Sequence, residues 1–152
     1  MTESGFELGL DQPDRCGVFF VTDDDLDALG VASRDAGLAV RRIDLGSCGD
    51  KATLMLRIGT ALDFPAGSGR NWDALSDRLR DLSWLEAGGY ALLLENAGGL
   101  PEADEAGFDT LLDVLEEAAA AWRDRAVPFW AFLAMPMAFF DALDPAGDEA
   151  GV

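Results

Sequence analysis

Three aspartates spaced four residues apart, Asp73, Asp77 and Asp81, are the side chains whose arrangement most suggests a chemical role. They follow the turn-forming segment Pro65–Gly69 and the residue Asn71, whose short amide can cap a helix by accepting a hydrogen bond from a backbone N–H. Apolar residues recur at helical spacing through the same segment: Trp72, Leu75, Leu79 and Leu82. The pattern predicts an amphipathic helix that presents a ladder of carboxylates over two turns.

A ladder of carboxylates on one helix has two interpretations. Arg78 and Arg80 stand close to it in sequence, so the ladder can belong to a solvated face of mixed charge. It can instead be an acidic surface for a cationic partner. Use of Asp73 and Asp77 as the acid and base of a hydrolase is not favoured, because two carboxylates on one exposed helix share similar environments.

Other motifs for catalysis or cofactor binding are incomplete. The loop Gly67–Arg70 lacks the Lys-Ser/Thr ending of a phosphate-binding loop. The acidic run Asp23–Asp27 begins like a calcium-binding loop, but Arg34 stands where that loop requires its final glutamate. The chain contains no histidine, which removes the commonest general base and the commonest metal ligand. We therefore expect a protein that is not an enzyme and that carries neither a cofactor nor a metal.

The charge of the chain restricts its partners. The net charge is −18 over 152 residues, so nucleic acid and anionic membrane surfaces would be repelled. A basic partner, a metal or a salty environment suits such a composition. Ten acidic residues and no basic residue lie between Arg80 and Arg123. A cleft formed by the ladder helix and this anionic section would attract a cation.

A cytoplasmic location is expected from the cysteines and from the first residues. Met1–Leu10 has no basic segment followed by an apolar run, and no apolar run approaches the length of a membrane span. With only Cys16 and Cys48 present, we expect reduced thiols rather than a structural disulfide.

The order of the expected elements indicates an α/β fold in one domain. Strands are expected at residues 17–22, 38–44, 90–96 and 128–133, and helices at about residues 23–36, 51–62, 72–82 and 105–122. Alternation of strands and helices favours a mainly parallel sheet of three to four strands packed with helices. Residues 1–15 are expected to form a loose arm, and residues 141–152 a frayed end.

The ladder segment resembles a known family. Its pattern, Gly69-x-Asn71-x-Asp73-Ala74-Leu75-x-Asp77-x-Leu79 preceded by Leu62-x-Phe64-Pro65, resembles the signature helix of the barstar family of ribonuclease inhibitors. The resemblance covers roughly residues 38–133. It implies a barstar-like domain with an N-terminal extension at 1–37 and a C-terminal tail at 134–152.

The family resemblance implies a bacterial protein that blocks the active site of a basic extracellular-type ribonuclease or a related toxin. It implies that Asp73, Asp77 and Glu117 are the inhibitory carboxylates, which can take the places of RNA phosphates. The remaining residues of the predicted partner-binding set are Gly67, Ser68, Asn71 and Ser76.

Small residues distinguish this chain from the family pattern. Gly67 and Ser68 stand in a loop where members often carry aromatic residues, and Ser76 stands where a bulky residue can separate the two acids. Aromatic residues are frequent hot spots of interfaces. A protein-binding regulatory module with a partner other than a ribonuclease therefore stays open as the alternative.

Overall fold

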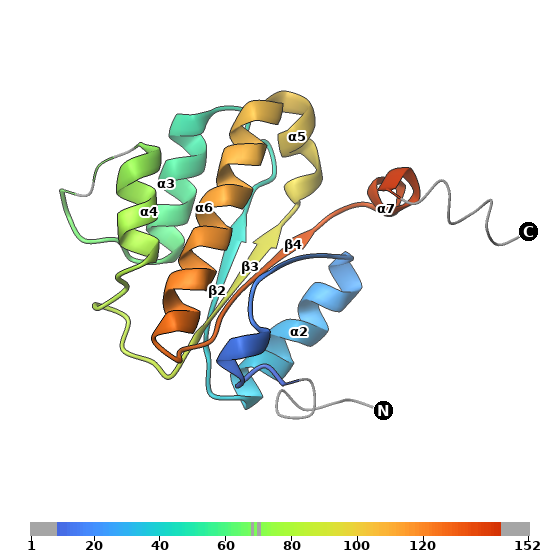
Figure 1. Cartoon of the computed structure of the whole chain (residues 1–152). Helices are drawn as coiled ribbons and strands as arrows, with labels where there is room; N and C mark the ends of the chain where they lie inside the picture. The colour runs from blue at the N-terminus through green and yellow to red at the C-terminus, as the bar shows by residue number, and fades with distance from the viewer. Residues whose placement is uncertain (1–8, 68, 70, 144–152) are drawn as a thin grey trace, which may run out of the picture.

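The structure is a computed structural model that describes residues 9–67, 69 and 71–143 (Figure 1). These residues contain a four-stranded sheet whose neighbouring strands are all parallel. The strands, in the spatial order β1-β4-β3-β2, are β1 (Val18–Val21), β4 (Phe129–Ala134), β3 (Tyr90–Glu95) and β2 (Ala39–Asp44). The expected α/β fold with a mainly parallel sheet is thus confirmed.

The two central strands coincide with two continuous apolar runs of the chain. Every residue of β4 is buried, and β3 is buried up to its last residue, Glu95. Their registers pair Leu92 with Ala131 and Leu93 with Phe132. A parallel strand that is covered on both faces can be apolar at every position, because neither face meets water.

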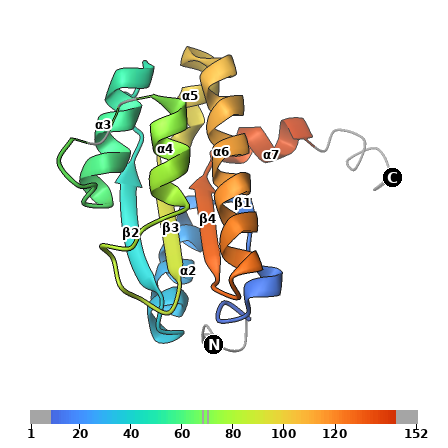
Figure 2. The same ribbon diagram turned by 60° about the vertical axis from the view of Figure 1, so that its left-hand side comes forward.

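Helices cover both faces of the sheet (Figures 1 and 2). The helices α3 (Lys51–Ala61), α4 (Trp72–Leu79) and α6 (Glu105–Asp124) lie on one face, and α2 (Asp23–Asp35) lies on the other. Short elements complete the described part: η1 (Pro13–Arg15), η2 (Ala97–Gly99), α5 (Leu100–Ala103) and α7 (Met137–Leu143). No helix in the described ranges is long and apolar enough to cross a membrane.

Each face of the sheet has its own hydrophobic core. The larger core lies between the sheet and the helices α3, α4 and α6; the buried leucine and isoleucine side chains that these helices contribute are Leu54, Ile58, Leu75, Leu79, Leu111 and Leu115. The smaller core lies under α2 and contains Leu26, Leu93, Trp130 and Phe132. Cys48 is buried in the larger core and Cys16 in the smaller one, and both thiols are free.

The described residues nearest the two chain ends differ from the expectation, while residues 1–8 and 144–152 lie outside the described part of the chain. Part of the predicted loose arm is packed: Leu10 is 2% exposed and its carbonyl oxygen accepts a 2.8 Å hydrogen bond from Trp130 Nε1. The expectation of a loose arm was wrong there, because the buried indole N–H of Trp130 requires a partner. At the other end, α7 continues to Leu143, past Asp141, where the sequence indicated fraying.

Candidate functional site

The local sequence explains the orientation of α4. Asn71 is its N-cap, and Asn71 Oδ1 accepts a hydrogen bond from Ala74 N at 2.8 Å. Leu75 and Leu79 are buried in the larger core, at 1% and 0% exposure. Residues Asp73 and Asp77 are therefore exposed on another face of the helix.

The C-terminal end of α4 is hydrogen-bonded to the helix α6. Trp122, on α6, donates a hydrogen bond from Nε1 to the carbonyl oxygen of Leu79 at 2.7 Å. That oxygen belongs to the last turn of α4, where backbone carbonyls have no partner within the helix. The two helices lie side by side in Figure 2, and this contact fixes them close to one another.

A groove of about 700 Å³ runs between the two helices. Its lining residues are Asp73, Ser76, Asp77, Arg80, Glu117, Ala120, Ala121 and Asp124. Four residues of the predicted set thus come together, three of them carboxylates. We call this site the α4–α6 groove.

The α4–α6 groove is strongly negative. Asp77 pairs with Arg80, with 2.7 Å between Asp77 Oδ1 and an Arg80 terminal nitrogen. Among the described residues, Asp73, Glu117 and Asp124 form no ion pair. One cation thus stands against four carboxylates, an arrangement that concentrates negative potential in a concave surface.

The carboxylate ladder itself is shorter than the sequence indicated. The helix α4 ends at Leu79, Arg80 is its C-cap, and Asp81 lies in the following turn. Leu82, buried at 0% exposure, then adopts a left-handed backbone with φ 48°. The predicted three-step ladder was therefore wrong at Asp81, because burial of the next leucine turns the chain away from the helix.

Two charged groove residues, Arg80 and Asp124, were absent from the predicted set, as were the alanines Ala120 and Ala121. Asp124 lies two helical turns after Glu117, but the predicted helix ended at Trp122, whereas α6 extends to Asp124. Arg80 is three residues after Asp77, a spacing at which oppositely charged side chains meet on a helix. Helical spacing was the signal that could have identified both residues.

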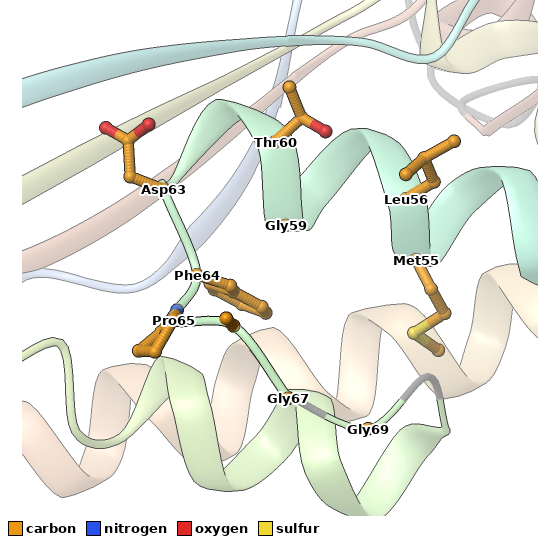
Figure 3. A pocket seen from close by; sticks show the side chains of 10 residues that line it. Met55, Leu56, Gly59, Thr60, Asp63, Phe64, Pro65, Gly67 and Gly69 are labelled. Carbon is orange, nitrogen blue, oxygen red and sulfur yellow. The ribbon is translucent and has the colours of Figure 1, made fainter.

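The loop residues of the predicted set lie elsewhere. Gly67, with φ 86°, lines a different hollow of about 400 Å³ between α3 and the loop. Figure 3 shows Met55 and Phe64 on the side of α3 that faces Gly67. Asn71 acts as the helix cap and is not a lining residue of the α4–α6 groove. Ser68 lies outside the described residues.

The described part of the chain contains no set of side chains arranged to bind a metal ion. No group of three or more acidic or cysteine side chains there is placed to hold a metal ion. The acidic side chains of the α4–α6 groove are instead spread along two helices and are exposed to solvent. Such an array suits several cationic groups of a macromolecule better than one small ion.

Comparison with known proteins identifies a family. The family described as "Barstar (barnase inhibitor)" matches residues 38–134, which is well over half of the chain. A search among curated proteins finds no match. The matched region begins just before β2 and ends with β4, so it contains the α4–α6 groove.

Proposed function

The chain belongs to the barstar family, and we propose that it is a stoichiometric inhibitor that blocks the active site of a basic ribonuclease or a related toxin. One observation carries the proposal: Asp73 and Asp77 from α4 meet Glu117 from α6 in one groove. We place this inhibitor in the bacterial cytoplasm, where it would protect its own cell.

The chemistry of a ribonuclease active site supports this role for the α4–α6 groove. Such a site binds the phosphates of RNA with cationic side chains, and carboxylates can form charge-assisted hydrogen bonds with the same cations. Asp73, Glu117 and Asp124 have no ion pair in the described chain, so a partner need not displace an internal cation to reach them.

The charge of the whole chain adds a kinetic advantage. A net charge of −18 attracts a basic enzyme over distances longer than the contacts themselves. Electrostatic attraction of this kind mainly raises the association rate, and the raised rate falls with increasing salt. A stoichiometric inhibitor needs fast association, because a ribonuclease that is not yet bound by the inhibitor continues to degrade RNA. In this role the protein has no catalytic turnover of its own.

The test is inhibition of RNA cleavage by small basic bacterial ribonucleases. We expect equimolar protein to stop cleavage by its target enzyme. Asp77→Ala should raise the inhibition constant by about thirtyfold or more, a range of interface effects to which barnase–barstar itself belongs. Glu117→Ala should act in the same direction.

The control variant is Asp109→Ala. Asp109 is an exposed carboxylate on α6 outside the α4–α6 groove, so its loss changes the net charge equally without touching the site. Equal effects of Asp77→Ala and Asp109→Ala would mean that only net charge matters. Absence of inhibition of any such enzyme at micromolar concentration would contradict the proposal.

A second function is favoured by the small residues near the site. Ser76 is a half-buried residue in the α4–α6 groove, where a larger side chain would give apolar contact area. The alternative is a regulatory module of the same fold with a partner other than a ribonuclease. Capture from lysate with wild type and Asp77→Ala distinguishes the two: a basic nuclease or toxin retained by wild type alone supports the inhibitor.

A further inference from the structure

Arg80 stands inside the acidic site rather than beside it. Among the described residues it is the single basic side chain that lines the α4–α6 groove. Its guanidinium lies 2.7 Å from Asp77 Oδ1, and its Nε donates a 3.2 Å hydrogen bond to the carbonyl oxygen of Ser76. Two contacts thus orient the guanidinium over the carboxylate that we assign to partner binding.

The ion pair is open to solvent and therefore exchangeable. The side chains of Arg80 and Asp77 are 45% and 72% exposed. Ion pairs at such exposure contribute little to stability, because water screens them and two long side chains lose freedom. A cation from another molecule can therefore take the place of Arg80 at low cost.

Helix stability alone does not require this contact. A basic residue near the C-terminus of α4 favours the helix dipole wherever its side chain points, and Arg78 already occupies the last turn. In the described chain Arg78 forms no ion pair and does not line the α4–α6 groove. The three-residue spacing and the ion pair with Asp77, rather than the helix dipole, thus set the orientation of Arg80 into the groove.

We propose that Arg80 is a built-in competitor for the α4–α6 groove, which occupies Asp77 until a cation of the partner displaces it. The inference rests on the proposed function in one respect, that the groove receives cationic groups of a partner. Arg80 thereby raises the positive charge that a partner needs in order to bind. A weakly cationic surface leaves the ion pair between Arg80 and Asp77 intact, whereas a partner that presents a cation directly to Asp77 displaces Arg80. A guanidinium is the best replacement, because it has the same planar array of donors.

The test compares two variants that each remove one positive charge near the C-terminal end of α4. Arg80→Met removes the competitor, and Arg78→Met is the matched control. A hexa-arginine peptide is the first probe, measured by calorimetry at physiological ionic strength. We expect Arg80→Met to bind the peptide about two- to fivefold more tightly than Arg78→Met, the range expected for loss of one exposed ion pair.

A double-mutant cycle assigns the effect to the pair. In an Asp77→Asn background, Arg80→Met should give no gain beyond that of Arg78→Met, because the carboxylate that Arg80 covers is absent. Equal affinities of Arg80→Met and Arg78→Met in the wild-type background would overturn the proposal. Weaker binding by Arg80→Met would also overturn it, since Arg80 would then assist the ligand.

The second probe is a basic ribonuclease that the wild type inhibits, in a catalytically inactive form. The same order of affinities is expected: Arg80→Met tighter than Arg78→Met. If no ribonuclease binds any variant, the proposed inhibitor function fails, whereas the peptide measurement still decides whether Arg80 competes for Asp77. A circular-dichroism melt of each variant confirms that the fold is retained.

Discussion

Asp44 joins the carboxyl ends of two neighbouring strands through one oxygen atom. Asp44 Oδ1 accepts hydrogen bonds from Asn96 Nδ2 and from Gly46 N, both at 2.9 Å. Asn96 has a left-handed backbone with φ 55°, which asparagine tolerates better than most residues. The hydrogen bond from Asn96, followed by that from Gly46, lowers the pKa of the Asp44 carboxyl below its ordinary value.

This lowered pKa predicts a dependence of stability on pH. The ionised Asp44 stabilises the fold fully above the ordinary aspartate pKa of about 3.9, and that stabilisation is lost as the pH falls below it toward the lower folded pKa. We expect Asp44→Asn to reduce the loss of stability between about pH 5 and pH 2. Urea denaturation at several pH values across this range, followed by circular dichroism, measures the free energy of unfolding of both proteins.

The control for that experiment is Asp109→Asn. Asp109 is exposed, and no hydrogen bond to its side chain occurs among the described residues. If the free energy of unfolding of Asp44→Asn depends on pH in the same way as that of the wild type, the Asn96 contact does not stabilise the ionised carboxylate.

At the scale of elements, α4 is a short helix that depends on its two ends. It has eight residues, fewer than an isolated helix needs to be stable in water. The Asn71 cap holds the start and the Trp122 hydrogen bond holds the end, while Leu75 and Leu79 bury one face. These contacts place Asp73 and Asp77, the two carboxylates that α4 contributes to the α4–α6 groove.

Removal of the cap should therefore affect stability and binding together. We expect Asn71→Ala to lower the free energy of unfolding by about 1 kcal/mol, because Ala74 N loses its partner. Since Asp73 lies in the first turn of α4, affinity for the target ribonuclease should fall as well. Denaturant unfolding and inhibition of RNA cleavage measure the two effects.

The matched control is Thr22→Ala. Thr22 caps α2 by the same type of contact, with Thr22 Oγ1 accepting from Asp25 N at 3.2 Å. Because α2 lies across the sheet from the α4–α6 groove, this variant should lose stability but keep its affinity. An equal loss of affinity in both variants would show that binding follows overall stability rather than the start of α4.

At the scale of the whole molecule, the segment before the barstar match is part of the sheet. The strand β1 pairs with β4, and Arg42 on β2 forms ion pairs with Asp27 on α2 and Glu95 on β3. Arg123 also donates a 2.9 Å hydrogen bond to the carbonyl oxygen of Cys16. Of the predicted N-terminal extension, residues 1–37, the structure describes residues 9–37. We propose that this described part folds together with the core of residues 38–133 as one domain.

One domain implies one unfolding transition. Leu26 on α2 is 2% exposed in the smaller core, and Leu26→Ala should lower the free energy of unfolding by about 2–5 kcal/mol. Val31, on the same helix, is 50% exposed, and Val31→Ala should change stability by less than about 0.5 kcal/mol. Urea unfolding followed by tryptophan fluorescence and by circular dichroism should give coincident transitions. Separate transitions would show that the extension unfolds independently.

Local sequence patterns were sufficient to predict the types and order of the main elements. Apolar runs such as Tyr90–Glu95 and helical spacing such as that of Leu75 and Leu79 are local patterns, and each pattern follows from the face that a strand or helix must bury. The Asn71 cap and the exposure of Asp73 and Asp77 were also readable, because they depend on residues only a few positions apart.

Which distant side chains share a surface became evident only from the packing of the helices. Glu117 and Asp124 meet Asp77 because α6 packs beside α4, and the hydrogen bond from Trp122 to Leu79 joins the two helices. The contact of Arg80 with Asp77 was visible only as a spacing, while its position inside the α4–α6 groove required the neighbouring helix. Burial of apolar surface between elements far apart in the chain fixes such placements, and no local pattern of residues records it.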